Sequence, residues 1–416
     1  MKRGDLLKSA AASCGSLAFG EGVTMTNSEA AGAPADAELN AILAAEWLDY
    51  HRRHPIAASL DGDRSGDDRW DDQSPAALAD EAAHQRTVLT RVERLDAAAL
   101  STGGALNRDL FAGQLRDTLR GYDLRSYLFA VDPRSGVQTY SGYADTLPFA
   151  SLRDYDAWQA RLDAYPAAVD QTIELLREAV AARLLWPRTS MQRVPAQIDR
   201  LLGAVESSPF YAPYLRIPAT LGSADAARIR ETARRTIDAA VNPALRRLRA
   251  FIAEVYLPAA PSQVGLSHLP GGEALYAYFA ASYTTTSMTP DAIHQLGLRE
   301  VARTREAMEA LAPQTGYRGD LSEIFAQLRS DPANYFTDPQ QLLTAYRAIA
   351  KRTDPELVRF FHLDSLPRLP YGVVPIPAAA APDTTTAYYR PGALDVRAPG
   401  CITSTSMSRR SGRATR

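Results

Sequence analysis

One long apolar stripe constrains the fold of this 416-residue chain more than any other feature. It keeps to one face of an α-helix for roughly seven turns, because its members recur every three or four positions. Pro166 lies within the stripe and predicts a kink or break near Tyr165. The stripe predicts a mainly α-helical, multi-helical protein. Its members are Trp158, Leu162, Tyr165, Val169, Ile173, Leu176, Val180 and Leu184.

A second helix is marked by its first residues. Thr289 is a suitable N-cap, Pro290 fits the first turn, and Asp291 lies beside the positive end of the helix dipole. The predicted buried face includes a glycine, Gly297, which suggests close approach of another backbone. Its members are Ile293, Gly297, Val301, Thr304, Met308 and Leu311. Further helices are predicted at residues 37–51, 75–100, 224–255 and 339–350.

Evidence for strands is confined to the region near the C-terminus. A Pro-rich stretch at residues 366–382 leads into Thr-Thr-Thr-Ala-Tyr-Tyr at residues 384–389, which reads as an extended segment. The expected fold class is therefore mainly α, multi-helical, with a small β element near the C-terminus.

The N-terminus resembles an export signal. Lys2 and Arg3 precede a weakly apolar run of small residues, and residues 31–35 read Ala-Gly-Ala-Pro-Ala. We expect residues 1–35 to be an export signal and linker of the twin-arginine or Sec type, and the protein to be periplasmic. Lipidation at Cys14 is a weaker alternative, because the residues before it make a poor lipobox. A frayed helical N-terminus is the other alternative.

The last residues have an unusual composition. Residues 401–416 are dominated by Ser, Thr, Arg and Gly and show no amphipathic period. The codons for residues 401–407, read from the third base of the Cys401 codon, permit Tyr-Tyr-Ile-Asn-Leu-Tyr, a better strand. We therefore expect an out-of-frame, prematurely ended tail. An ordinary disordered tail is the alternative.

Composition excludes some classes of partner. The 46 basic and 48 acidic residues give a formal net charge of −2, which does not favour nucleic acid or an anionic membrane as the main partner. No apolar run reaches the roughly 18 residues of a transmembrane helix. The chain also lacks a Gly-x-Ser-x-Gly elbow and a Gly-rich phosphate loop.

Two segments carry residue types that bind metals, but neither has the full pattern of a metal site. His51 and His54 have the spacing of a ligand pair, but Pro55 follows and no His-Glu dipeptide occurs, so we interpret both as surface histidines at a helix end. Residues 61–72 resemble a calcium loop, but Asp68 takes the place of an apolar residue, which favours a solvated turn. We therefore assign no metal ligands in this chain.

Several uncommon strings resemble, in the same order, a bacterial family known as domain of unknown function 885 (DUF885). Its members resemble zinc peptidases of the gluzincin kind. The likeness covers residues 37–400. The strings are Arg-Trp-Asp-Asp-Gln-Ser-Pro at 69–75, Leu-Pro-Gly-Gly-Glu-Ala at 269–274, Tyr-Thr-Thr-Thr at 283–286 with Thr289-Pro290, Ile-His-Gln-Leu-Gly-Leu at 293–298, and Ala-Tyr-Tyr at 387–389.

The resemblance implies a zincin-like architecture that is incomplete here. The family's His-Glu zinc motif follows the strand after the double tyrosine, and this chain stops first. Residues 36–400 would be the helical body of a DUF885-like domain, incomplete at its C-terminal end. Zinc is implied for full-length members, where it activates water while the Glu acts as general base.

The part of the family's active site that remains in this chain would be the side that faces a peptide substrate. Tyr388 or Tyr389 would donate to a developing oxyanion, and Arg397 would hold a peptide carboxylate. Core packing is the alternative for the tyrosines, and a surface role for Arg397. Three consecutive threonines either line a pocket or satisfy the end of a helix. The candidates for substrate binding are Tyr388, Tyr389, Arg397, Thr284, Thr285, Thr286 and His294.

Two functions therefore compete. In the first, the chain is a truncated member of an exported zinc metallopeptidase family and is inactive because the zinc motif is absent. In the second, it is a non-catalytic helical protein that binds peptides or envelope components. A third possibility is that a chain lacking its C-terminal part exposes apolar faces and is not stable.

Overall fold

The computed structural model describes residues 34–366, 371–376, 381, 387–390, 401–404 and 414–415. Residues 1–33 of the predicted export signal and linker, Cys14 and Arg397 lie outside these residues, as does most of the predicted tail, whereas Pro34 and Ala35 begin a helix. The chain divides into two compact units, Met1–Tyr283 and Thr284–Arg416, which are described separately.

The first unit is helical throughout its described part. Short 3₁₀ segments connect many of the helices, the longest at Val137–Asp145. Its α-helices are α2 (Pro34–Arg53), α3 (Pro55–Asp61), α4 (Pro75–Arg94), α5 (Thr102–Asp123), α6 (Leu152–Ala182), α7 (Arg188–Met191), α8 (Val194–Leu201), α9 (Ser223–Thr236), α10 (Asn242–Phe251), α11 (Leu257–Ala259) and α12 (Gly272–Thr284).

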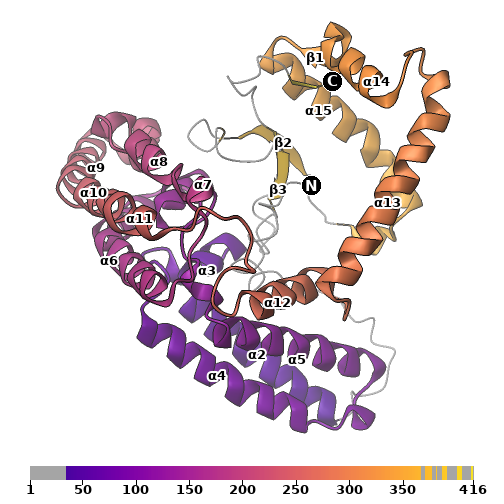
Figure 1. Ribbon diagram of the computed structural model, residues 1–416. Helices are drawn as coiled ribbons and strands as arrows, with labels where there is room; N and C mark the ends of the chain where they lie inside the picture. Colours follow the sequence, from indigo (N-terminus) through magenta and orange to yellow (C-terminus); the bar gives the residue numbers. More distant parts are fainter. Residues whose placement is uncertain are drawn as a thin grey trace. The chain divides into compact units, whose positions relative to one another are not determined.

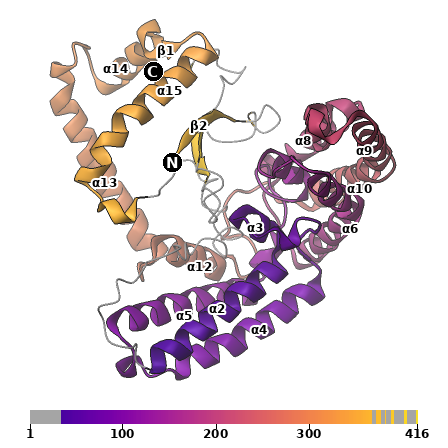
Figure 2. The ribbon, with the colours of Figure 1, turned by 180° about the vertical axis from the view of Figure 1, so that it is seen from behind.

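Helices α2, α4 and α5 lie side by side and share a small core of their own (Figures 1 and 2). Leu39 and Ile42 of α2 pack there with Val88 and Val92 of α4. This packing holds polar positions of α2 and α4 close together where the two helices meet. Ser74 starts α4, since its side chain accepts a hydrogen bond from the Ala77 N–H at 3.2 Å.

Helix α6 is the centre of the larger core. The predicted stripe is confirmed: Trp158, Leu162 and Tyr165 are buried, and the stripe stays buried as far as Leu176. Of the predicted kink or break near Tyr165, the break is wrong, since α6 runs through Pro166 as one helix of 31 residues, and the kink stays a prediction. Packing of so long an apolar face outweighs the loss of one backbone hydrogen bond at proline.

Helices α9, α10 and α11 follow one another without a loop. They are joined by two π-helical turns, Ile237–Val241 and Ile252–Tyr256. Pro243 and Pro258 stand just after these turns. Because proline has no N–H and its ring crowds the carbonyl four residues earlier, a wider turn at each site accommodates it without ending the helix.

The described residues of the second unit form three α-helices and several short strands. Its elements are α13 (Pro290–Leu311), α14 (Leu321–Ser330), α15 (Pro339–Thr353), β1 (Tyr335–Phe336), β2 (Gly372–Pro375), β3 (Ala387–Arg390), β4 (Cys401–Ser404) and β5 (Ala414–Thr415). β4 lies between β2, to which it is parallel, and β3, to which it is antiparallel. β1 pairs with β5. The expected class, mainly α with a small β element near the C-terminus, is confirmed.

Helix α13 begins as predicted, because the Thr289 side chain accepts a hydrogen bond from the Ala292 N–H at 3.2 Å. Its predicted buried face is wrong. No residue of α13 is buried among the described residues, and Val301 is 68% exposed. A Cβ at Gly297 would have no described atom within 4 Å, so the described residues provide no close backbone there. The spacing of apolar residues identifies a helix face but not an element that covers it.

Within the part of the chain that the structure describes, no helix combines the length and the apolar character needed to cross a membrane.

Candidate functional site

Three histidines, each in contact with two carboxylates, lie on or beside α2 and α4. These are His51, His54 and His84, and we call them with their partners the histidine–carboxylate network. The partners are Glu46 and Asp49 on α2, Asp61 and Asp63 at and after the end of α3, Asp71 in the loop before α4, and Glu81 on α4.

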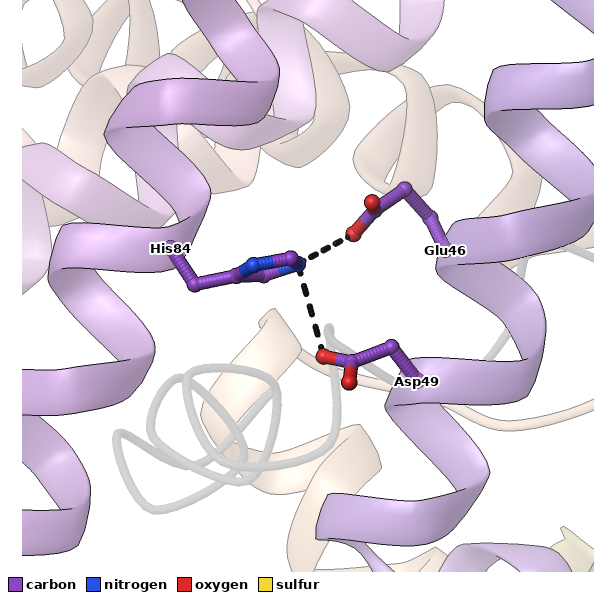
Figure 3. Close-up of side chains that lie close together, drawn as sticks. All are labelled: Glu46, Asp49 and His84. Atoms are coloured by element: carbon purple, nitrogen blue, oxygen red, sulfur yellow. Dashed lines mark hydrogen bonds and ion pairs between the residues drawn. The ribbon is translucent and has the colours of Figure 1, made fainter.

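Helices α2 and α4 bring His84 to a pair of acids. His84 Nε2 lies 2.8 Å from Glu46 Oε2 and 3.4 Å from Asp49 Oδ2 (Figure 3). Glu46 and Asp49 are three positions apart and so lie on one face of α2. These three residues form the one group of ligand-type side chains, among the described residues, whose atoms lie within 4.8 Å of one another.

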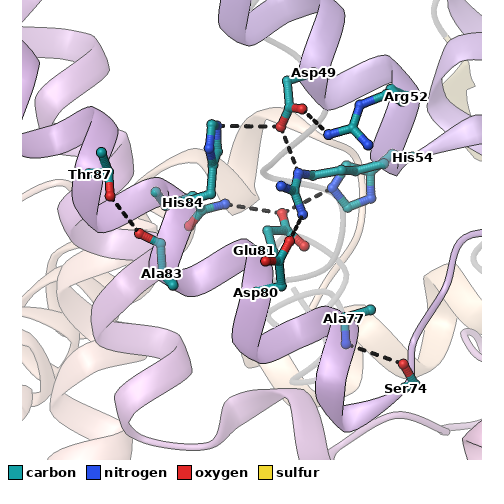
Figure 4. A network of polar contacts seen from close by, with 12 residues as sticks. Asp49, Arg52, His54, Ser74, Ala77, Asp80, Glu81, Ala83, His84 and Thr87 are labelled. Atoms are coloured by element: carbon teal, nitrogen blue, oxygen red, sulfur yellow. Dashed lines mark hydrogen bonds and ion pairs between the residues drawn. The ribbon is translucent and has the colours of Figure 1, made fainter.

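Two arginines also contact Asp49. Arg53 Nε donates to Asp49 Oδ2 at 2.6 Å, and Arg52 donates to Oδ1 (Figure 4). Burial acts to raise the pKa of Asp49, but these hydrogen bonds and the charge of Arg53 outweigh it and lower the pKa below its usual value. Arg53 has a second partner, since its Nη1 donates to Asp80 Oδ2 at 2.7 Å.

His54 bridges the loop before α4 and α4 itself. Its Nδ1 lies 3.5 Å from Asp71 Oδ2. Its Nε2 lies 3.0 Å from Glu81 Oε1 (Figure 4). Burial disfavours the charged ring, but the two carboxylates more than offset it and raise the pKa of His54 to about 9. His54 is therefore an imidazolium at neutral pH and serves as a cation between two acids.

We expect His54 to stabilise the fold only where it can be charged. Its pKa rises from 6.5 to about 9 on folding, so its contribution is complete below pH 6.5 and is lost as the pH rises through 9. His54→Gln should lower the free energy of unfolding by up to about 3 kcal/mol at pH 6. The difference from wild type should vanish near pH 10. Urea unfolding of both proteins at the two pH values tests this, and an equal difference at both would contradict it.

His51 contacts its acids through both ring nitrogens. Its Nε2 lies 3.0 Å from Asp61 Oδ2, and its Nδ1 lies 3.5 Å from Asp63 Oδ2. His51 is only 5% exposed, so its interpretation as a surface histidine is wrong, whereas His54 is partly exposed. Asp61 and Asp63 are two acids of the calcium-like segment, which is exposed at Asp68 and packs against His51 through these two acids.

Two residues of the string Arg-Trp-Asp-Asp-Gln-Ser-Pro, Arg69 and Trp70, contact the buried side chain of Arg161. Arg161 of α6 is 0% exposed, and its Nε donates to the carbonyl of Arg69 at 2.9 Å. Its Nη2 donates to Ser59 Oγ at 2.9 Å and to the Gly66 carbonyl at 3.1 Å. The Trp70 indole N–H donates back to the Arg161 carbonyl at 2.7 Å. Arg161 thus fastens the segment between α3 and α4 to the central helix.

The three candidate threonines form the turn that ends α12. Thr285 has a φ of +52°, which takes the chain out of the helix. The Thr285 hydroxyl donates to the Thr284 carbonyl at 2.8 Å, and Thr284 Oγ1 lies 2.9 Å from Thr286 Oγ1. These hydroxyls therefore take part in local contacts at the end of the helix, and their role in a pocket stays a prediction.

The other candidates lie elsewhere in the second unit. Tyr388 and Tyr389 are neighbours on β3, opposite Thr403 and Ile402 of β4. Tyr388 is 37% exposed and Tyr389 is 59% exposed, and as successive strand residues they point to opposite faces. His294 is exposed on α13. The structure groups the threonines in one turn and the tyrosines on one strand, and their roles stay predictions.

Sequence reasoning missed the cluster of Glu46, Asp49 and His84. Glu46 and Asp49 have helical spacing, but His84 is 38 positions beyond Glu46 and carries no local signal. Only the packing of α2 against α4 brings it near, and the apolar positions of both helices could have predicted that packing.

Comparison with known proteins identifies the family. A family model described as "Bacterial protein of unknown function (DUF885)" matches residues 55–413. No curated protein matches the chain.

Two solved structures have a similar fold. The crystal structure of "the putative lipoprotein from Colwellia psychrerythraea" has a TM-score of 0.82 at 16% identity, over 91% of this chain and 68% of that one. "A putative lipoprotein of unknown function from Shewanella oneidensis" has a TM-score of 0.53 at 19% identity, over 92% of this chain and 67% of that one. At these identities the likeness concerns the fold alone. The family match covers most of the chain, so the expected resemblance is confirmed and the protein belongs to the bacterial DUF885 family.

Proposed function

We propose that this protein is an exported, envelope-associated, non-hydrolytic peptide-binding member of a zinc-peptidase lineage, and that peptides contact it at β3. The family resemblance supports the lineage. The description of two structural neighbours as lipoproteins, together with the basic and then apolar N-terminus, supports export to the envelope.

The observation that carries the binding proposal is the exposure of Tyr389. Its ring is 59% exposed on a short strand that forms one end of the three-stranded order β2-β4-β3. A rigid aromatic ring on a strand offers a large apolar contact together with a hydroxyl that donates to a peptide carbonyl. Tyr388 faces the opposite side of the sheet, so we assign the main contact to Tyr389.

The chain's residues do not fit the zinc centre that the resemblance implies. Each of the six histidines is followed by a residue other than Glu, so the His-Glu pair of that motif is absent from these 416 residues. The cluster of Glu46, Asp49 and His84 has one histidine and two acids, which is a different ligand set. We therefore derive no hydrolytic step for this chain.

Tyr389→Ala should weaken peptide binding at least about fivefold, because truncation of an exposed aromatic anchor at a contact costs more than about 1 kcal/mol. Fluorescence polarisation with labelled peptides of mixed sequence measures the affinity. Mass spectrometry of the same peptides after long incubation should show no cleavage, with or without added zinc.

Tyr276→Ala is a matched control, since Tyr276 is an exposed tyrosine on α12. It should leave the affinity unchanged. Equal binding by wild type and Tyr389→Ala would overturn the assignment to β3. Chelator-sensitive cleavage would overturn the non-hydrolytic proposal, and binding of purified envelope glycans but not of peptides would favour an envelope-component ligand instead.

A further inference from the structure

The three histidines of the network differ in one respect. His51 and His54 each contact their two carboxylates through opposite ring nitrogens. At His84 both carboxylates lie against the same nitrogen, Nε2. An imidazole nitrogen carries one hydrogen at most and donates one good hydrogen bond, so a second carboxylate at 3.4 Å has no proton to accept from it.

This convergence is the arrangement of metal ligands. We propose that Glu46, Asp49 and His84 bind one divalent transition-metal ion, with Zn²⁺ as the best match. Ligand bonds of about 2.0–2.2 Å place neighbouring ligand atoms about 3.3–3.6 Å apart in tetrahedral geometry. The distance of 3.4 Å from His84 Nε2 to Asp49 Oδ2 lies in that range, and the ion would separate His84 Nε2 and Glu46 Oε2, now 2.8 Å apart, by about 0.5 Å or more.

The ligand types define the class of ion. One imidazole nitrogen with two carboxylate oxygens suits Zn²⁺ and similar divalent ions, whereas Ca²⁺ and Mg²⁺ prefer oxygen ligands alone. Two acids neutralise the two charges of the ion. The three side chains are partly exposed, so the ion has access from solvent and water can complete its coordination.

Arg53 would compete with the ion for the carboxylate of Asp49. Its Nε donates to Asp49 Oδ2, the same oxygen that lies nearest His84. Arg53 also pairs with Asp80, so it keeps a carboxylate partner when Asp49 turns to the metal. Removal of this cation should therefore strengthen metal binding. A simple network of salt bridges predicts no such gain.

The test is calorimetric titration of the metal-free full-length protein with ZnCl₂, with CaCl₂ in parallel. Wild type should bind one equivalent of Zn²⁺ and much less Ca²⁺. His84→Ala and Glu46→Gln should each weaken binding at least about 100-fold, the upper range for loss of an outer-shell partner. Arg53→Gln should strengthen binding at least about tenfold, because a positive charge no longer faces the ion. His294→Ala, at an exposed histidine on α13, should change nothing.

Circular dichroism establishes that each variant is folded. Glu46→Gln keeps the shape of the side chain and so provides a test if His84→Ala fails to fold. With Co²⁺ as probe, visible absorption should appear in wild type and disappear in Glu46→Gln. No Zn²⁺ binding by wild type, unchanged binding in Glu46→Gln, or no gain in Arg53→Gln would each overturn the proposal.

Discussion

Replacement of Arg161 by methionine is expected to lower the free energy of unfolding by about 3 kcal/mol, since three buried or partly buried acceptors lose a donor and each costs about 1–3 kcal/mol. These are the carbonyls of Arg69 and Gly66 and the hydroxyl of Ser59. Methionine fills much of the volume but donates nothing. The guanidinium also lies 5.0 Å from the centre of the Trp70 ring, and that attraction is lost as well.

Thermal unfolding followed by circular dichroism measures this effect. For a unit of this size, about 3 kcal/mol corresponds to a fall of about 6–12 °C in the melting temperature. Arg153→Met is the matched control, because Arg153 is an exposed arginine on the same helix. It should melt within about 1–2 °C of wild type, as surface substitutions usually do. A melting temperature of Arg161→Met equal to that of the control would contradict the assigned role.

The parts of the fold that could be predicted are those that depend on local sequence patterns. The stripe of α6 and the start of α13 at Thr289 follow from periodicity and capping, and both are confirmed. The same periodicity predicted a buried face on α13, where the described residues provide no covering element. Periodicity reports which face is apolar, whereas burial depends on tertiary packing.

Polar contacts were harder to predict because their partners are distant in sequence. His54 looked like a surface histidine beside a proline, yet Asp71 and Glu81 make it a partly buried cation. The string at residues 69–75 indicated a family but did not indicate what its residues do in the structure. Its structural role depends on Arg161, 91 positions beyond Trp70, and no local pattern links the two.

The backbone conformation at Gly271 and the close packing at Gly272 explain the two glycines of a second family string, Leu-Pro-Gly-Gly-Glu-Ala. Gly271 has a φ of +67°, which favours glycine. At Gly272 the constraint is one of space, because a Cβ would lie 1.7 Å from the carbonyl oxygen of Leu266 and 2.7 Å from its carbonyl carbon. Both obstacles are backbone atoms that no side-chain rotation can move. This close approach joins the preceding loop to the first turn of α12.

Gly272→Ala is therefore expected to lower the free energy of unfolding by about 3 kcal/mol or more, as overpacking against backbone does in the severe cases. Urea unfolding at constant pH measures it. Gly113→Ala is the matched control, since Gly113 is exposed within α5 and a Cβ there would have no atom within 4 Å. Because alanine favours the helix, this control should gain about 0.5–1 kcal/mol. The two substitutions are chemically identical, so opposite signs would show that space at the Leu266 carbonyl, and not glycine flexibility, determines residue 272. A loss of equal size at both positions would refute that explanation.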